Sequence, residues 1–283
     1  MLLDLRTRSA RIVSGLAAVT VGLLAVAALS SGPASAITNG ELDGAGHPAV
    51  VLVLMEVDGE PAFRCSGTLI EPKLVLTAGH CTGEGGKGGE FSGMRVFAEA
   101  DVQSDTTYPG PGGPHTVEAT NWHTFPGFTS DQFFLSDVGV IELADPIILS
   151  AGSYGQLPTA NQLDALKPRA STKFTAVGFG LQRVNNNPNN SQLLASRVRM
   201  VAHPQLLQIN TGFTGPQSLL LSNNTHTGGT CFGDSGGPNF LGTSLVVAGV
   251  TSFGLNGSCG GTGGVFRVDR PAVLDFINSY TTP

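Results

Sequence analysis

The chain has 283 residues, enough for one large all-β domain or two small ones that each bury a core. Its 39 glycines, 17 prolines and only 13% charged residues favour short strands joined by many turns over long charged helices. The net charge is −6 and no run of lysine or arginine occurs, so binding to nucleic acid has no electrostatic basis and we expect no such partner.

The first 36 residues have the pattern of a secretory signal peptide. Three arginines precede an apolar stretch at 12–29, and Ala34-Ser35-Ala36 has the small-x-small form of a signal-peptidase site. A membrane anchor is the alternative, because the apolar stretch is longer than most signal cores. Glycine and threonine dilute that stretch, so we favour cleavage after Ala36, an extracellular location and no membrane contact after cleavage.

From residue 37 onward the sequence predicts one short strand after another. Apolar, β-branched stretches alternate with turn signals such as Asp58-Gly59. The expected strands cover 49–54, 63–70, 74–77, 94–98, 138–143, 174–177, 219–221, 244–250 and 264–268. The polar stretches 83–93 and 185–191 are rich in glycine or asparagine and predict surface loops, and the mixed segment 151–167 predicts a crossing between two halves. Apolar residues at helical spacing after Pro271 predict a C-terminal helix at about 271–280.

The four cysteines predict two disulfides, because an exported chain folds in an oxidising compartment. Sequence alone allows three pairings. Cys65 and Cys81 flank one hairpin-like stretch, and Cys231 and Cys259 flank another, so these two pairs are the economical choice. A zinc site is the rival interpretation, but no cysteine or histidine cluster has ligand spacing, so we expect no metal and no cofactor.

The chemistry of the chain is expected at the stretch from Cys231 to Pro238. Its sequence is Cys-Phe-Gly-Asp-Ser-Gly-Gly-Pro, which predicts a tight turn that exposes the hydroxyl of Ser235. The backbone N–H groups of Gly233 and Ser235 could point together at a carbonyl oxygen as it becomes an oxyanion. A glycine-rich surface turn with a spare serine is the simpler alternative.

Two upstream residues complete a candidate catalytic group. His80 stands directly before Cys81 at the end of an apolar strand, where it would be held in place as a general base. Asp137 opens the apolar strand 138–143, and a carboxylate buried there needs hydrogen-bond donors. The N–H of a histidine is such a donor, and the carboxylate in return fixes the tautomer of the ring. A surface histidine and an aspartate that caps a turn are the plain alternatives.

These blocks resemble the three signature motifs of the trypsin-like serine endopeptidases. They are Thr77-Ala78-Gly79-His80-Cys81, Asp137 before its strand, and Gly233-Asp234-Ser235-Gly236-Gly237-Pro238. Nearly all of the chain after residue 36 shares the likeness, including Ile37-Thr38-Asn39-Gly40, Val177-Gly178-Phe179-Gly180 and Ser252-Phe253-Gly254. Phe179 and Phe253 stand where the family commonly has tryptophan, and Gly139 replaces a larger residue.

The resemblance implies an all-β fold of two antiparallel six-stranded barrels, with the site in the cleft between them. The expected domains are a signal peptide at 1–36 and a peptidase domain at 37–283. The peptidase domain would divide into barrels at about 37–150 and 151–270 and a helix at 271–280. The resemblance also implies a role for each site residue. Ser235 would be the nucleophile, His80 the base and then the acid, and Asp137 the residue that orients His80. Gly233 and Ser235 would be the oxyanion donors.

The same resemblance assigns a specificity pocket and an activation pair. Gly229 would form the pocket floor beside Thr230, with further pocket residues at Ser252, Phe253, Gly254 and Gly264. Glycine at the floor cannot pair with lysine or arginine, so we expect large apolar residues on the acyl side of the cut bond. A freshly cut amine at Ile37 would pair with Asp234 and order the oxyanion loop.

We therefore expect a monomeric secreted endopeptidase whose partners are protein or peptide substrates. An esterase acting on small molecules is one alternative, although such enzymes more often carry Gly-x-Ser-x-Gly in a parallel α/β fold. A catalytically silent homologue used for binding is the other, although it would be expected to lack one of the three catalytic residues.

Overall fold

The structure is a computed structural model that describes residues 37–83, 91–185, 192–211 and 215–282. The predicted signal peptide lies outside the described residues, as do 84–90 and 186–191 within the two predicted loops. Among the described residues, no helix is long and apolar enough to cross a membrane.

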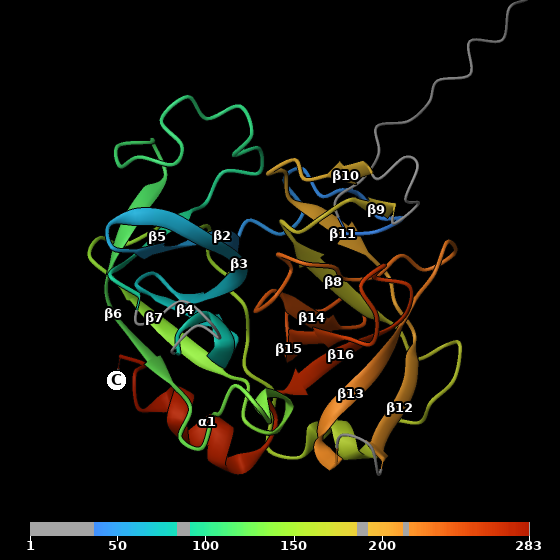
Figure 1. Cartoon of the computed structure of the whole chain (residues 1–283). Coiled ribbons are helices and arrows are strands. Elements are labelled where there is room, and N and C mark those ends of the chain that lie inside the picture. Colours follow the sequence, from blue (N-terminus) through green and yellow to red (C-terminus); the bar gives the residue numbers. More distant parts are fainter. Residues whose placement is uncertain (1–36, 84–90, 186–191, 212–214, 283) are drawn as a thin grey trace, which may run out of the picture. The chain divides into compact units, whose positions relative to one another are not determined.

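The first half of the described chain is a closed barrel of six antiparallel strands (Figure 1). Its strands, in chain order, are β2 (Val50–Val57), β3 (Glu60–Glu71), β4 (Leu74–Thr77), β5 (Gly93–Phe97), β6 (Thr116–Thr124) and β7 (Gly139–Leu143). They neighbour one another in the order β2-β3-β4-β7-β6-β5. β2 is buried on both faces as far as Met55, which explains why its sequence is a continuous apolar run and does not alternate.

The second half is one eight-stranded antiparallel sheet in the order β1-β11-β8-β14-β15-β16-β13-β12. The strands are β1 (Glu41–Leu42), β8 (Phe174–Gly178), β11 (Met200–Ala202), β12 (Leu206–Thr211), β13 (Gly215–Asn223), β14 (Pro238–Leu241), β15 (Val247–Gly254) and β16 (Gly261–Arg267). A separate pair is formed by β9 (Arg183–Asn185) and β10 (Gln192–Leu194). Three short 3-10 turns are η1 (Gly79–Cys81), η2 (Phe133–Leu135) and η3 (Gln162–Ala165).

The two ends of the described chain cross between the halves. β1 comes before the barrel in sequence but pairs with β11 in the second sheet. The helix α1 (Pro271–Asn278) comes last but packs against the barrel, where Phe276 meets Phe125 edge to face. Its buried residues Val273, Leu274 and Ile277 join the same apolar core as β2 and β4. This exchange ties the halves together and stabilises the surface on which the site is built.

The predicted fold class is confirmed: the protein is mostly β, with a closed six-stranded barrel, a partly closed second sheet and one C-terminal helix. The predicted strands all overlap observed strands, but β1, β6, β9, β10, β11, β12 and β14 were not predicted. β6 carries polar and half-exposed residues throughout, and β14 begins at Pro238 directly after the serine turn. Their apolar patterns are too weak or too short to identify a strand without the neighbours that pair with them.

Candidate active site

His80 lies at the junction of β4 and the turn η1, where a disulfide limits its movement. Cys65 of β3 and Cys81 are bonded across a sequence separation of 16, and Cys231 is bonded to Cys259. Both bonds are the pairs expected from the sequence. A disulfide closing a loop of this length contributes about 3 kcal/mol to stability. The sulfurs of Cys65 and Cys81 lie near His80, but because they are bonded to each other they cannot serve as thiolate ligands to a metal.

Asp137 is fully buried and collects its hydrogen bonds from His80 and Ser252. The backbone N–H of His80 donates to Oδ1 at 2.9 Å, and the ring Nδ1 lies 2.9 Å from Oδ2. The hydroxyl of Ser252 donates to Oδ2 at 2.5 Å. These donors compensate for the loss of water around a buried carboxylate. They also hold the ring so that its Nε2 faces away from Asp137.

Burial and Asp137 act in opposite directions on the pKa of His80. Burial disfavours the charged ring and lowers its pKa, whereas the charge and hydrogen bond of Asp137 raise it. The second influence is the stronger, so the pKa of His80 lies above the ordinary value of 6.5. The side chain of His80 keeps 30% of its surface exposed, and that exposed part lines a cavity.

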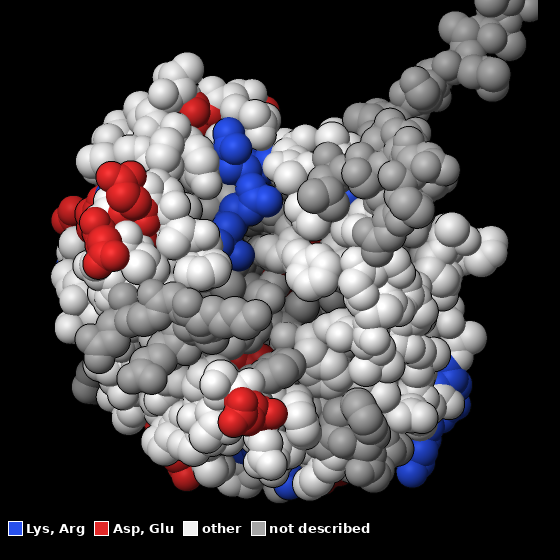
Figure 2. Space-filling view, in the orientation of Figure 1, with Lys and Arg blue, Asp and Glu red and all other residues white. Residues whose placement is uncertain are grey.

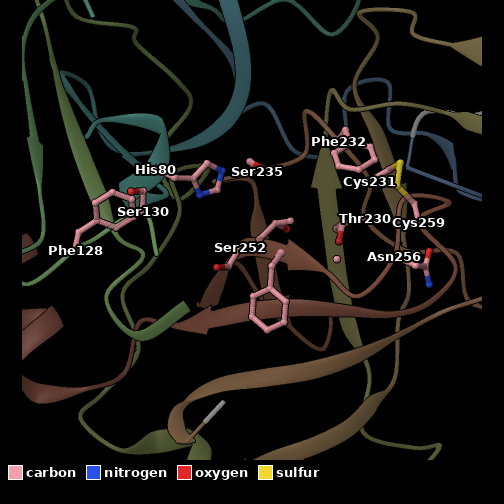
Figure 3. A pocket seen from close by; sticks show the side chains of 13 residues that line it. His80, Phe128, Ser130, Thr230, Cys231, Phe232, Ser235, Ser252, Asn256 and Cys259 are labelled. Carbon is pink, nitrogen blue, oxygen red and sulfur yellow. A yellow bond between two sulfur atoms is a disulfide. The ribbon is translucent and has the colours of Figure 1, made fainter. Parts of the chain in front are cut away.

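Ser235 lines the same cavity, and its hydroxyl lies beside the ring of His80 (Figure 3). Two glycines with positive φ, Gly233 at 93° and Gly236 at 77°, make the turn that presents it. A Cβ at Gly236 would stand 2.0 Å from the hydroxyl oxygen of Thr77 in β4. Only glycine therefore allows the serine turn to approach the barrel this closely, and the carbonyl of Ser235 accepts the N–H of Ser66 in β3 at 2.8 Å.

The N–H groups of Gly233 and Ser235 have no protein acceptor among the described residues, although their neighbours do. Asp234 donates to the carbonyl of Cys231, and Gly236 donates to that of Thr251. The carbonyl of Gly233 is fixed by the hydroxyl of Ser66 at 2.9 Å. Two free N–H groups on a fixed turn beside a serine hydroxyl can stabilise a negatively charged oxygen.

The cavity beside Ser235 has a volume of about 400 Å³ and is largely apolar. It lies between the serine turn and β15, with the Cys231–Cys259 disulfide and Asn256 on the side away from His80 (Figure 3). Phe128, Phe232 and Phe253 supply ring surface to its wall. Among the described residues of the wall, none other than His80 carries an ionisable side chain.

The structure brings only part of the expected specificity pocket to this cavity. The described residues that line the cavity include Thr230, Ser252, Phe253 and Gly254 but not Gly229 or Gly264. The side chain of Asn223 lies against Gly229, where a Cβ would stand 2.3 Å from its Cγ. The ring of Phe253 covers Gly264 in the same way, since a Cβ there would stand 2.3 Å from Cζ. Asn223 thus fills the space beside the expected pocket floor, and Phe253 fills the space beside one of the expected wall glycines.

The expected activation pair is not joined among the described residues. Ile37 is completely buried against Ala176, Met200 and Ala202. Asp234 is also completely buried, and it accepts N–H groups from Gly180 at 2.7 Å and Cys231 at 2.8 Å. Because Ile37 is still joined to Ala36 in the full chain, it carries no ammonium that could pair with a carboxylate. Burial raises the pKa of Asp234 to about 7, although its N–H donors and the charge of Arg64 lower it.

Comparison with known structures places the fold in the chymotrypsin class. An HL collagenase superposes with a TM-score of 0.66 at 21% identity, covering 87% of this chain and 100% of that chain. A human heparin binding protein superposes with a TM-score of 0.62 at 22% identity, covering 87% of this chain and 99% of that chain. At these identities the likeness defines the fold alone.

Sequence comparison then gives the family. The Trypsin family model matches residues 43–277, so the chain belongs to the trypsin family of serine proteases. It is 29% identical to brachyurin of Leptuca pugilator over 70% of this chain and 78% of that protein. It is 27% identical to human kallikrein-12 over 91% of this chain and 93% of that protein. It is 26% identical to the serine protease Hayan of Drosophila melanogaster, and the match covers 87% of this chain and 39% of Hayan.

Proposed function

We propose that the protein is a secreted serine endopeptidase that cuts peptide bonds through an acyl-enzyme intermediate. The observation that carries the proposal is the alignment of Asp137, His80 and Ser235 beside an apolar cavity. Membership of a family whose relatives are serine proteases supports it. Secretion rests on the signal-peptide pattern of residues 1–36 and is consistent with two disulfides.

In this mechanism His80 takes the proton of Ser235 as the hydroxyl attacks the carbonyl carbon of the substrate. Asp137 holds the ring and stabilises the imidazolium that forms. The carbonyl oxygen becomes negatively charged and accepts the free N–H groups of Gly233 and Ser235. His80 then gives its proton to the leaving amine, and water hydrolyses the acyl-enzyme through the same steps in reverse.

The proposal is tested by labelling and by a substrate panel. A fluorophosphonate should modify wild-type protein at Ser235, which a catalytically silent homologue would not allow. Matched peptide and ester substrates should both be cleaved, because acyl transfer from an ester is the easier reaction. Cleavage of small esters with no cleavage of any peptide would favour the esterase alternative.

We predict that activity rises with pH as His80 loses its proton. Since Asp137 raises the pKa of His80 above 6.5, the half-maximal rate should fall above that pH. At pH 5.5 less than about a tenth of the ring is neutral. The measurement is kcat/KM for a peptide anilide from pH 5 to 9. Asp137→Asn should lower the plateau and shift the rise to lower pH, and a rate that is flat from pH 5 to 8 would argue against a histidine base.

We also predict that the cavity selects large apolar side chains on the acyl side of the cut bond. Phenylalanine, tyrosine and leucine should be preferred over lysine and arginine, because no carboxylate lines the cavity in the part of the chain that the structure describes. Gly254→Val tests its size, since a Cβ at Gly254 meets only the carbonyl of Asn256, at 3.6 Å. The added side chain should reduce kcat/KM for phenylalanine substrates about tenfold or more relative to alanine substrates.

Gly257→Val is the matched control for the pocket. It lies on the neighbouring loop, does not line the cavity, and has open space where a Cβ would stand. The Gly257→Val variant should have the same substrate preference as the wild type. A wild-type preference for arginine before the cut bond would contradict the assignment of an apolar pocket. Gly229→Asp would place a carboxylate at the expected pocket floor, but the contact with Asn223 leaves no room for that side chain.

A further inference from the structure

Two arginines that influence each other, Arg64 beside the serine turn and Arg197, lie outside the proposed catalytic group. Arg64 stands in β3 directly before Cys65, and its Nε is 3.7 Å from the position that a Cβ on Gly233 would occupy. Arg197 lies just before β11, in the other half of the molecule. In Figure 2 a group of basic side chains lies near the middle of the visible face, over the region of β2 and β3 in Figure 1.

Neither arginine has an ion pair among the residues that the structure describes, although Arg95, Arg199, Arg267 and Arg270 do. Asp234 is the acidic side chain that influences Arg64, but it is buried and occupied by the N–H groups of Gly180 and Cys231. Arg64 is itself half-buried. The protein has a net charge of −6, so carboxylates are more numerous than basic groups. Two arginines that nevertheless lack a carboxylate partner indicate a site for an anionic ligand.

Arg197 is held in place by packing and backbone contacts and not by an acid. Its guanidinium carbon lies 4.1 Å above the centre of the Tyr108 ring, a cation–π arrangement. Its backbone exchanges hydrogen bonds with Gln103 of the loop after β5. Its Nε is buried without a hydrogen-bond partner among the described residues. The group is therefore fixed in direction while part of its donor capacity stays unused.

The two guanidinium groups also affect each other. Burial lowers the pKa of Arg64, and the positive charge of Arg197 lowers it further, while Tyr108 and Asp234 act in the opposite direction. Arginine stays charged in proteins, so this repulsion remains in the free protein. An anion between the two groups would relieve it, and the planar guanidinium suits a carboxylate in particular.

The position of Arg64 identifies which part of a substrate it would meet. The acyl side of a bound peptide points its side chain into the cavity between the serine turn and β15, and Arg64 does not line that cavity. The leaving amine must be on the side of His80, because His80 supplies its proton. The Cys65–Cys81 disulfide holds β3 beside His80, and Arg64 of β3 lies close to Gly233 of the serine turn. We infer that the chain after the cut bond passes Arg64.

We propose that Arg64 and Arg197 form a carboxylate-binding subsite for the leaving-group side of the substrate. The carboxylate comes either from an aspartate or glutamate within the first few residues after the cut bond or from the C-terminus of a short peptide. The proposal rests on the proposed peptidase function and gives its substrate class: peptides that are apolar before the cut and acidic after it.

The experiment uses quenched fluorescent peptides that share one acyl side with phenylalanine before the cut. The peptides carry glutamate or glutamine at one of the first three positions after the cut bond, varied one position at a time. Each peptide is made with a free and with an amidated C-terminus. Wild-type kcat/KM should favour glutamate over glutamine by about fivefold to tenfold at one position, the range expected of a half-buried ion pair. The preference should shrink as salt rises. If only the free C-terminus gives the preference, the carboxylate source is the peptide terminus.

Variants assign the preference to the two arginines. Arg64→Gln and Arg197→Gln should each reduce the glutamate-to-glutamine ratio towards one, and Arg64→Lys should retain part of it. Arg169→Gln removes an exposed charge outside this group and should leave the ratio unchanged. The ratio compares two substrates on one protein, so a variant with lower overall activity is still informative.

Failure of the subsite and failure of the proposed function give different results. Cleavage of a phenylalanine anilide, which has no residues after the cut bond, reports the peptidase alone. If the anilide is cleaved and wild-type protein treats glutamate and glutamine alike with either C-terminus, the subsite proposal is overturned. If nothing is cleaved, binding of the same peptides to Ser235→Ala, followed by fluorescence anisotropy, decides the subsite: equal affinities for both peptides overturn it and tighter binding of glutamate supports it.

Discussion

Ser235→Ala should lower kcat for a peptide substrate by about four to six orders of magnitude, because the serine and its base act as one unit. His80→Ala should cost about as much, since without the base the hydroxyl is a poor nucleophile at neutral pH. Asp137→Ala should be somewhat less damaging but still severe. Steady-state hydrolysis of one apolar peptide anilide measures all three variants.

Ser150→Ala is a suitable control, because Ser150 is an exposed serine that does not line the cavity. It should retain wild-type activity, and thermal unfolding should establish that each catalytic variant is folded. Near wild-type peptidase activity in Ser235→Ala would refute the assignment of the nucleophile. Loss of activity in Ser235→Ala together with unchanged fluorophosphonate labelling would indicate that the label reacts elsewhere.

The residues at the centre of the candidate site were predictable because each lies in a strong local pattern. His80 lies between an apolar strand and a cysteine, and Ser235 lies in a turn whose glycines are required by positive φ and by close contact with β4. Asp137 was identified by the cost of burying a carboxylate at the start of an apolar strand. The structure brings the three side chains to one place, as the order of the motifs implied.

Other contributions to the site had no local signal in the sequence. Ser252 was expected only as a pocket residue, but its hydroxyl also binds Asp137, far away in the chain. Asn223 fills the space beside Gly229, and nothing in its own sequence neighbourhood indicates that it does so. Such contacts depend on how two halves of the fold pack together, and a pattern read along one segment cannot contain them.

One unusual residue found in the sequence has a clear reason in the structure. Gly139 stands where the family carries a larger residue, and a Cβ there would lie 2.2 Å from the hydroxyl oxygen of Thr82. Thr82 is buried and bonds the hydroxyl of Thr124 at 2.9 Å. The volume lost at Gly139 is thus filled from the neighbouring turn, which keeps the barrel packed beneath Asp137.

The second large effect that we predict concerns the N-terminus of the processed protein. Ala34-Ser35-Ala36 directly precedes Ile37, so cleavage at the predicted signal-peptidase site would leave an ammonium on Ile37 itself. Ile37 is buried in the second half, and Thr38 pairs with Gly229, two residues before Cys231 of the serine turn. We propose that this ammonium pairs with Asp234 and that export alone produces the active form.

Asp234 gives this proposal its physical basis. The buried carboxyl has a pKa of about 7 while Ile37 remains part of a longer chain, because its N–H donors and Arg64 do not fully compensate for burial. An ammonium beside it would favour the charged carboxylate and lower the pKa. A protein that begins at Ile37 should therefore be fully active, whereas one with a few residues ahead of Ile37 should be weakly active until it is trimmed. Asp234→Asn should be weakly active in both forms.

Stability gives a readout that does not depend on activity. In the extended protein the folded pKa of Asp234 lies above its ordinary value of 3.8, so the unfolded chain loses this proton first as pH rises. The contribution of Asp234 to stability should therefore fall between about pH 4 and 7 in the extended protein, because that is the interval between its unfolded and folded pKa values. Pairing with the ammonium should reduce or reverse that fall. Unfolding of the two forms across this range, with Asp234→Asn as the control, measures the difference.

N-terminal sequencing of the secreted protein should begin at Ile37. If the secreted protein begins well upstream and is fully active, or if the extended and exact-start proteins have equal rates and equal pH profiles of stability, Ile37 does not activate the enzyme. The oxyanion loop would then be ordered by the contacts already present in the full chain. Those contacts are the N–H groups of Gly180 and Cys231 on Asp234 and the hydroxyl of Ser66 on Gly233.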